Sequence, residues 1–180
     1  MGHRYFYFDS AIRGKDCDDL VEQYKDQDFE EAKINDSEDA PLKIRKSKVI
    51  WINARSLIAR TVFSYVQEAN QRNFGLNLSG DNELVQLTKY DIGDQYNWHI
   101  DNIQKSPREP LRALSASVQL SKPEDYTGGA LQLFNGTIDP EVLPIQNQGS
   151  IIVFRSLEWH RVTELTKGVR YSLVFWAGGC

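Results

Sequence analysis

The sequence predicts a mainly β protein with supporting α-helices, in which the helices come first and short strands follow. Runs rich in β-branched and aromatic residues are separated by turns of Gly, Pro, Asn and Asp. No helical pattern lies between these runs, as a parallel α/β sheet would require, so a sandwich, jelly roll or small barrel is favoured. The predicted strands span residues 84–90, 95–101, 111–120, 130–134, 149–155, 158–164 and 169–176.

Length and composition indicate one globular domain over residues 1–180. The chain has 180 residues, enough for one domain with a sizeable core and too few for two. Its net charge of −4 and pI of about 5.4 disfavour strong binding to nucleic acid. Cys17 and Cys180 match no metal-ligand spacing, and no run of about 18 apolar residues predicts a membrane span. We therefore expect a cytoplasmic protein without a membrane partner.

The first part of the chain is predicted to contain two strands and a helix. A short strand over 5–8 precedes an amphipathic helix over 15–26, and a second strand is expected over 43–53. Between them, residues 26–41 are acidic and poor in apolar side chains, which indicates an exposed loop or a weak edge strand. The apolar side of the helix carries Leu20, Val21 and Tyr24.

The main helix is predicted over residues 56–73. Its apolar residues recur at helical spacing, so they would cover one face of a sheet. Residues 1–83 would thus form the helical support and residues 84–178 the β core. The apolar face of the main helix comprises Leu57, Ile58, Val62, Tyr65, Val66 and Ala69.

A histidine and an aspartate stand two positions apart in one predicted strand. Successive side chains of a strand point to opposite faces, so His99 and Asp101 share one face. Trp98 and Ile100 would share the other face, toward the supporting layer. Alone, such a pair is more often part of a solvent-exposed strand than of a metal site. His160, on another predicted strand, would complete a set of two imidazoles and one carboxylate, the facial triad that binds non-haem Fe(II).

An arginine on the last predicted strand strengthens the metal hypothesis. Arg170, Ser172, Val174 and Trp176 share a face, so a guanidinium and a hydroxyl would enter the same interior. A buried guanidinium needs an anion, and its planar fork matches a carboxylate. A dicarboxylic cosubstrate would supply that anion. The alternative is that Arg170 pairs with an Asp or Glu at the rim of the barrel.

Several motifs together resemble a known family. They are YDIGDQYNWHID (90–101), YTGGAL (126–131), His160 and RYSLVFW (170–176). This order and spacing resembles the Fe(II)/2-oxoglutarate-dependent dioxygenases, and is most similar to their prolyl 4-hydroxylase-like branch, which includes the PKHD-type hydroxylases. The resemblance covers about residues 84–178, and agreement at several independent places makes a chance match a poor explanation.

The resemblance implies a double-stranded β-helix of the jelly-roll or cupin-like type, with His99, Asp101 and His160 as catalytic iron ligands. It implies that 2-oxoglutarate chelates the iron and places its distal carboxylate on Arg170. Ascorbate is a candidate reductant. The other cofactor-binding residues that it implies are Tyr90, Ser172 and Trp176.

The predicted strand 111–120 has one polar and one apolar face. A purely structural interpretation sends the polar side chains of Ser115, Ser117 and Gln119 to solvent. In the family that the sequence resembles, the matching strand points alternate residues at the cosubstrate, which makes Gln119 and Ser117 candidate pocket residues. The apolar face would then meet the main helix. It comprises Leu114, Ala116, Val118 and Leu120.

Three further residues have a second interpretation or depart from the family pattern. Trp176 is equally well explained as a core aromatic residue. Tyr96 is expected near the pocket mouth, although strand parity puts it opposite His99. Ala130 stands where many relatives have an acidic residue after a Gly-Gly pair; the pair itself still permits positive φ and close backbone approach.

The implied reaction is hydroxylation of a C–H bond, foremost in a peptidyl proline, with decarboxylation of 2-oxoglutarate to succinate and CO2. Loops 73–83 and 102–110 are expected to form the entrance, with 102–110 acting as a lid or as an ordinary exposed loop. The alternatives are a small-molecule substrate such as a free amino acid, an alkylated nucleic acid, or a jelly-roll binding module without catalysis. Trp176 disfavours nucleic acid because it stands where a second arginine would be expected, and the intact triad disfavours the binding module.

Overall fold

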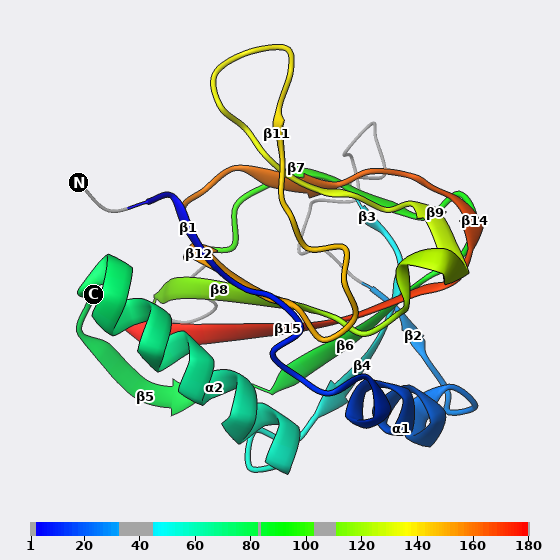
Figure 1. The fold of residues 1–180 in the computed structure, drawn as a ribbon, viewed down its shortest axis with the longest axis horizontal. Coiled ribbons are helices and arrows are strands. Elements are labelled where there is room, and N and C mark those ends of the chain that lie inside the picture. Colours follow the sequence, from blue (N-terminus) through cyan, green and yellow to red (C-terminus); the bar gives the residue numbers. More distant parts are fainter. Residues whose placement is uncertain (1–2, 33–44, 83, 103–110, 180) are drawn as a thin grey trace.

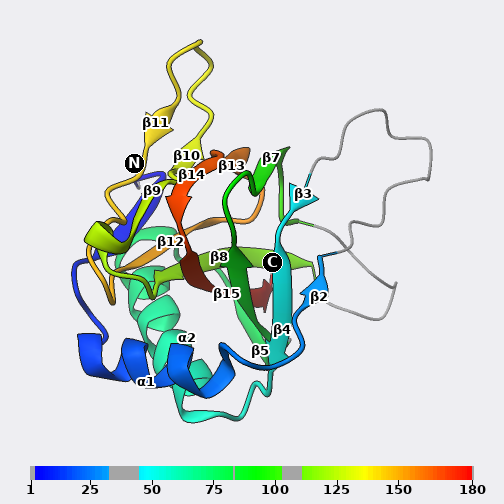
Figure 2. The ribbon, with the colours of Figure 1, turned by 90° about the vertical axis from the view of Figure 1, so that its right-hand side faces the viewer.

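The computed structural model describes residues 3–32, 45–82, 84–102 and 111–179, and places two antiparallel sheets face to face (Figure 1). Within these residues the larger sheet has eight strands and the smaller one five. A third sheet has two strands. The two helices lie on the outer side of the larger sheet, away from the smaller one (Figure 2). The predicted jelly-roll architecture with helical support is confirmed.

The larger sheet has the order β1-β12-β8-β15-β6-β4-β2, and β5 pairs with the last residues of β15. All of its neighbouring strands are antiparallel. Its strands are β1 (Tyr5–Phe8), β2 (Glu30–Glu31), β4 (Lys48–Ile52), β5 (Leu78–Asn82), β6 (Val85–Tyr90), β8 (Arg112–Gln119), β12 (Ile151–Arg155) and β15 (Arg170–Gly179).

The smaller sheet has the order β11-β10-β13-β7-β3 and is also antiparallel. Its strands are β3 (Arg45–Lys46), β7 (Gln95–His99), β10 (Leu131–Leu133), β11 (Glu141–Val142) and β13 (His160–Val162). The two-stranded sheet pairs β9 (Tyr126–Gly128) with β14 (Leu165–Gly168).

The helices are α1 (Gly14–Tyr24) and α2 (Leu57–Ala69), and a π-helical turn over Asn70–Phe74 continues α2. The hydroxyl of Ser56 accepts a hydrogen bond from the backbone N–H of Ala59 and so caps the first turn of α2. Predicted apolar residues of α1 pack against the core cluster beneath the sheet, as expected; they are Leu20, Val21 and Tyr24.

One residue predicted for the buried face of α2 is exposed. Leu57 is 75% exposed, whereas Ala59 and Val62 are 1% and 0% exposed. Because an α-helix turns about 100° per residue, Leu57 lies about 200° around the axis from Ala59. The inclusion of Leu57 in the apolar face is therefore wrong, and Ala59 takes that place. The other members of the predicted face pack on the core: Ile58, Val62, Tyr65, Val66 and Ala69.

The larger sheet has an apolar outer face and a polar inner face. The apolar set of β8, namely Leu114, Ala116, Val118 and the following Leu120, belongs to the cluster that packs under the helices. The polar set is buried on the inner side, with Ser115, Ser117 and Gln119 exposed by 1%, 8% and 0%. The interpretation that sends this polar set to solvent is therefore wrong.

Six of the seven strands predicted for the second half are present with trimmed ends, and the last, predicted over 169–176, runs on to Gly179 as β15. Several short strands were not predicted. The sequence prediction for 43–53 merges β3 and β4, which belong to different sheets. Residues 73–83, expected as an entrance loop, contain part of the π-helical turn and β5, and residues 73–79 do not line the pocket described below. Two stretches lie outside the described residues. Residues 103–110 make up most of the other expected entrance loop. Residues 33–44 include the second part of the acidic segment 26–41 and the start of the strand predicted over 43–53. No helix in the described ranges is long and apolar enough to cross a membrane.

Candidate metal centre and its pocket

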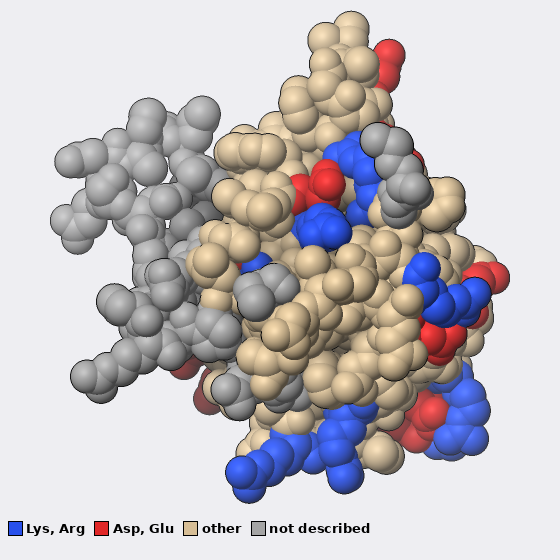
Figure 3. Space-filling model, turned by 90° about the vertical axis from the view of Figure 1, so that its left-hand side faces the viewer, with Lys and Arg blue, Asp and Glu red and all other residues tan. Residues whose placement is uncertain are grey.

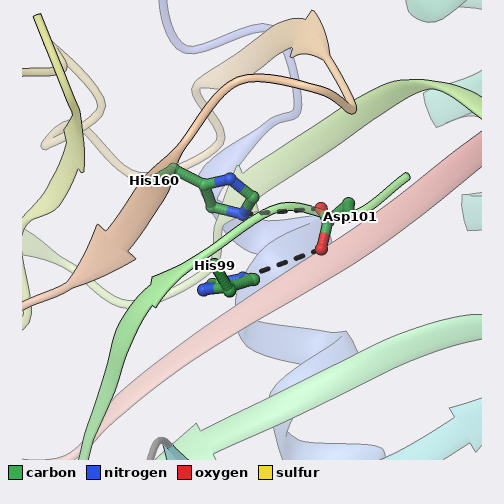
Figure 4. A group of neighbouring side chains, drawn as sticks. All are labelled: His99, Asp101 and His160. Atoms are coloured by element: carbon green, nitrogen blue, oxygen red, sulfur yellow. Dashed lines mark ion pairs between the residues drawn. The ribbon is translucent and has the colours of Figure 1, made fainter. Parts of the chain in front are cut away.

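Three candidate metal ligands meet between the two sheets, as Figure 4 shows. His99 ends β7, Asp101 follows two residues later, and His160 begins β13. The antiparallel register pairs His99 directly with His160, which brings residues far apart in the sequence side by side. One ligand atom from each of the three residues lies within 4.8 Å of the others, close enough to share one ion.

An irregularity in β7 decides which side chains accompany His99. Tyr96 pairs with Val162 and His99 with His160, so β7 has one more residue between these pairs than β13 has. Such an extra residue is a β-bulge, which shifts the alternation of side chains. The Tyr96 ring consequently stacks on the His99 imidazole, with centroids 3.4 Å apart. The opposite placement that simple parity gave for Tyr96 is wrong, while its expected position at the pocket is confirmed.

Backbone carbonyl groups orient both imidazoles. Nδ1 of His99 donates to the carbonyl oxygen of Asn97 at 2.7 Å, and Nδ1 of His160 donates to that of Glu158 at 2.9 Å. A proton on Nδ1 leaves a lone pair on Nε2, the atom that each ring turns toward Asp101. The Nε2 atoms lie 3.7 Å and 3.5 Å from the Asp101 carboxylate oxygens.

Asp101 is held by the larger sheet, through its carboxylate, and by the segment after β12, through its backbone. Its backbone N–H donates to the carbonyl oxygen of Ser156 at 2.9 Å, and the Ser115 hydroxyl donates to Oδ2 at 2.8 Å. The hydroxyls of Ser115 and Ser156 are themselves 2.8 Å apart. One oxygen of Asp101 is thus hydrogen-bonded, and its orientation is fixed before any ligand binds.

Burial and neighbouring charges set the protonation of His99 and Asp101. Burial and the neighbouring His160 lower the pKa of His99 to about 3, so its imidazole is neutral near pH 7. Burial alone would raise the pKa of Asp101, but His160 and His99 outweigh it and lower that pKa. Neutral imidazole and ionised carboxylate are the states that bind a metal ion.

The triad lines a pocket of about 270 Å³ between the sheets. Side chains that alternate along β15 reach it, as strand parity predicted, and Gln119 lies behind it in contact with Arg170. The sequence-predicted residues that line the pocket besides the triad are Tyr90, Tyr96, Ser117, Arg170, Ser172, Val174 and Trp176.

Arg170 is a buried cation without a carboxylate partner among the described residues. It is 2% exposed, and its Nε donates to Oε1 of Gln119 at 3.0 Å. Gln119 in turn donates from Nε2 to the carbonyl oxygen of Ser121 at 3.0 Å, which fixes its amide. The Tyr90 and Tyr126 rings lie 5.6 Å and 6.0 Å from the guanidinium carbon. Nη1 is buried without any hydrogen-bond partner.

These contacts exclude, within the described residues, the alternative in which Arg170 pairs with an acidic residue at the rim. An unpaired buried guanidinium is costly unless a ligand supplies the negative charge. The orphaned Nη1 group therefore indicates an anion site at the inner end of the pocket, and a carboxylate matches its geometry.

The Gly128-Gly129 pair has the backbone conformation that the sequence analysis expected. Their φ values are +85° and +60°. A Cβ on Gly128 would collide with the carbonyl oxygen of Glu164, and one on Gly129 would lie 3.0 Å from Cδ of Arg170. The pair thus lets the β9–β10 connection approach the arginine closely. Ala130, next to the pair, contacts Thr163 through its backbone: its N–H donates to the Thr163 hydroxyl at 2.9 Å, and its carbonyl oxygen accepts from the Thr163 N–H at 3.0 Å.

The prediction that Trp98 faces the supporting layer is wrong. Its ring lies 5.8 Å from that of Phe134, and the Arg161 guanidinium lies 4.6 Å above it. These neighbours belong to the smaller sheet and the segment after β10, whereas the helices pack on the larger sheet. Trp98 therefore lies on the outer surface of the smaller sheet.

Five polar or aromatic residues of the pocket wall were not predicted from the sequence: Arg45, Trp51, Gln86, Arg112 and Phe154. Trp51 and Gln86 pair across β4 and β6, and Gln86 pairs with Val174 of β15, so strand parity could have found both once the strand order was known. Arg45 and Arg112 stand at the starts of strands, where the local pattern gives no sign of the pocket.

Comparison with known families gives one match over half of the chain. Residues 85–178 match the family described as the 2OG-Fe(II) oxygenase superfamily. The chain is 33% identical over 94 residues to a PKHD-type hydroxylase of Pseudomonas fluorescens, covering 50% of this chain and 41% of that protein. It is 29% identical over 127 residues to one of Synechococcus, covering 67% and 55%. The chain thus spans about half the length of these curated relatives.

Solved structures with a similar fold include two prolyl hydroxylases. A Pseudomonas putida prolyl-4-hydroxylase superposes with a TM-score of 0.73 at 20% identity, covering 99% of this chain and 94% of that one. A Trichoplax adhaerens prolyl hydroxylase, in complex with a hypoxia-inducible-factor peptide, gives 0.76 at 19% identity and covers 98% and 84%. At such identities the likeness is one of fold.

Proposed function

Because the chain belongs to the 2OG-Fe(II) oxygenase superfamily, we propose that it is a 2-oxoglutarate-dependent dioxygenase that hydroxylates a peptidyl proline. The observation that carries this proposal is the joint presence, in one pocket, of a His-Asp-His cluster and a buried arginine with an orphaned N–H group. The family supplies the two ligands that such a pair fits, Fe(II) and 2-oxoglutarate.

In this proposal His99, Asp101 and His160 hold the iron. Two imidazoles with their Nε2 atoms directed at one carboxylate suit Fe(II), and three protein ligands leave other coordination positions open. The carbonyl groups that accept from Nδ1 and the Ser115 hydroxyl keep the ligands oriented. The function of these outer contacts is to hold the site ready, so that little reorganisation accompanies metal binding.

In the same way Arg170 receives the distal carboxylate of 2-oxoglutarate. Nη1 gains its missing acceptor, while Gln119 keeps Nε engaged and so fixes the plane of the guanidinium. Ser172 is two residues along the same strand and lines the pocket beside Arg170, where its hydroxyl can add a hydrogen bond. Tyr90 pairs with Arg170 across β6 and β15 and completes the wall around the cosubstrate. Trp176 covers the pocket further along β15.

Bound iron and 2-oxoglutarate would, with dioxygen as oxidant, supply the oxidation: one oxygen atom of O2 enters the succinate formed with CO2 from 2-oxoglutarate, and the other becomes the hydroxyl on the substrate carbon. The chain contributes ligands, a cation for the cosubstrate and apolar walls that exclude water. Ascorbate would serve as the reductant that restores Fe(II) after unproductive turnover.

A peptidyl proline is the substrate that the relatives favour. The similar structures described above are prolyl hydroxylases, and one of them is a complex with a peptide. A pocket walled by Leu131, Val174 and Trp176 provides apolar contact for a ring without charge. Small molecules remain the nearest alternative class.

An alkylated nucleic acid is less well supported. On the face that Figure 3 shows, Lys and Arg side chains of the described residues are interspersed with Asp and Glu rather than gathered in one field. Backbone binding to nucleic acid needs a clustered basic surface. We propose one dioxygenase domain over residues 1–180, and the cytoplasmic location stays a prediction.

The test is a screen of proline-containing peptides with Fe(II), 2-oxoglutarate, ascorbate and air. We expect a mass gain of one oxygen on proline, with succinate formed in equal amount. Stimulation by alkylated nucleotides alone would contradict the prolyl assignment. Absence of succinate under every condition would contradict the dioxygenase itself.

A further inference from the structure

Two arginines line the pocket besides the one assigned to 2-oxoglutarate. Arg45 comes from β3 of the smaller sheet and Arg112 from the start of β8 in the larger sheet. Neither belongs to the triad or to the contacts of Arg170. The proposed reaction gives them no task, so their place in the wall needs a separate explanation.

Arg45 is oriented by contacts that leave its charge unmatched. Its Nε donates to the Ser47 hydroxyl at 2.9 Å, and Nη1 donates to Oε1 of Gln86 at 3.5 Å. The guanidinium carbon lies 4.6 Å above the Tyr96 ring, which itself stacks on His99. All of these partners are neutral, and within the described residues no carboxylate forms an ion pair with Arg45.

Fe(II), 2-oxoglutarate and Asp101 leave no negative charge over to pair with Arg45. In the proposed loaded site, the two positive charges of Fe(II) and that of Arg170 are balanced by Asp101 and by the two carboxylates of 2-oxoglutarate. Among the described residues, the charge of Arg45 is then left without a carboxylate, at the Tyr96 side of the pocket. A third molecule that enters this pocket, the substrate, therefore meets a net positive wall.

Aromatic side chains of the larger sheet form a neighbouring part of the wall, since Trp51 pairs across β4 and β6 with Gln86, which accepts from Arg45. The rings of Trp51 and Trp176 lie 6.2 Å apart, and the Arg112 guanidinium carbon lies 3.8 Å from the centre of the Trp176 ring. Trp51 is 40% exposed and Trp176 is 6% exposed, so the pair leads from the surface into the pocket. Such a platform accepts an apolar ring or chain, and aromatic faces suit proline.

We propose that Arg45 makes this pocket selective for substrates with a carboxylate close to the residue that is hydroxylated. The carboxylate pairs with the Arg45 fork while the apolar part lies along Trp51 and Trp176. The inference rests on the proposed function, which it refines from peptidyl proline to proline in an acidic peptide. The carboxylate belongs either to a neighbouring Asp or Glu side chain or to the free C-terminus of the peptide.

The experiment compares proline peptides of equal length. One carries Glu next to proline, one Gln and one Lys, each with an amidated C-terminus, and a further Gln peptide has a free C-terminus. Binding is measured anaerobically by tryptophan fluorescence on enzyme loaded with Fe(II) and 2-oxoglutarate. Hydroxylation is measured separately in air by mass. We expect about tenfold tighter binding and higher kcat/KM for a peptide with the carboxylate, and weakest binding for the Lys peptide.

Variants at position 45 separate charge from shape. In the Arg45→Gln enzyme, the ratio of the affinity for the Glu peptide to that for the amidated Gln peptide should fall to about one. The Arg45→Lys enzyme should keep part of this preference. Arg60→Gln serves as the matched control because Arg60 is an exposed residue of α2 away from the pocket, and its preference should equal that of the wild type. Thermal unfolding of each variant verifies that the fold is retained.

The outcomes distinguish this inference from the proposed function. Hydroxylation of all peptides with equal efficiency would leave the proposed function intact and overturn the role of Arg45, as would a Glu preference that survives in Arg45→Gln. Arg45-dependent binding of the Glu peptide without hydroxylation would support the acidic subsite and contradict prolyl hydroxylation. A preference only for the free C-terminus would support the subsite and assign its carboxylate to the peptide end.

Discussion

The two faces of the larger sheet come from the same strands and have opposite chemistry. On β15, Leu173 and Phe175 pack under the helices, while Arg170, Ser172 and Trp176 enter the pocket. Both faces are buried, so alternation here does not separate core from solvent. It separates a face that stabilises the fold from a face that binds ligands. Burying the polar residues of the second face costs folding free energy, and these residues are present because ligand binding requires them.

This comparison predicts that substitutions on the two faces fail in different ways. The largest effect is expected at the triad. His99→Ala should abolish iron binding and all succinate formation, because one of three ligands is lost, while thermal unfolding of the iron-free protein changes little. Metal content and product mass measure this. His3→Ala is the matched control, since His3 is exposed and lies outside the cluster; loss of iron in that variant would argue against the assigned triad.

On the helix side the loss should appear in stability instead. Leu173 is fully buried, so Leu173→Ala should lower the free energy of unfolding by about 3 kcal/mol through the cavity it leaves. Denaturant unfolding measures this, and the affinity for iron should not change. Ser172→Ala, one residue earlier on the other face, should do the reverse, with weaker 2-oxoglutarate binding and nearly unchanged stability. If both variants lost stability alone, the division of the faces would be wrong.

A moderate effect is expected where the larger sheet supports the triad. Ser115 donates to Asp101, so Ser115→Ala should weaken iron binding about tenfold by freeing the carboxylate. Competition with a chelator of known affinity provides the measurement. Ser64→Ala, an exposed serine of α2, is the control; an equal effect there would show that the loss is not specific to the hydrogen bond.

The smallest effect concerns the edge of the helix layer. Leu57→Ala should change the free energy of unfolding by no more than about 0.5 kcal/mol, because the side chain is 75% exposed. Val62→Ala, on the buried side of the same helix, should cost about 2 kcal/mol. Comparable losses in the two variants would mean that Leu57 is covered in solution.

Much of this organisation follows from local patterns. Two-residue alternation correctly grouped the side chains of β8 and β15, and the spacing of His99, Asp101, His160 and Arg170 was enough to select the residues that the fold brings together. Polar residues alternating with apolar ones could not by themselves say which face is wet. The family resemblance supplied that choice, and the burial of Gln119 bears it out.

The remaining features depend on information that is absent from any single segment. Tyr96 changed sides because the pairing of β7 with β13 contains a bulge, which appears only when both strands are aligned. Leu57 was wrongly assigned to the buried face of α2 because shifting the first residue of an apolar pattern by one position leaves its average helical periodicity unchanged. Arg45 was missed because the short strand that carries it joins the smaller sheet, while the next strand joins the larger one.

The central claim is that the polar inner face of the larger sheet binds a cosubstrate beside iron. The most direct test is an anaerobic titration of the Fe(II)-loaded protein with 2-oxoglutarate, followed by the weak visible charge-transfer band. We expect a saturable band in the wild type. In Arg170→Ala, iron binding should persist while the concentration of 2-oxoglutarate at half-saturation rises about a hundredfold, since a buried charged contact is lost. No band in the wild type, or equal loss of iron and 2-oxoglutarate in the variant, would contradict the claim.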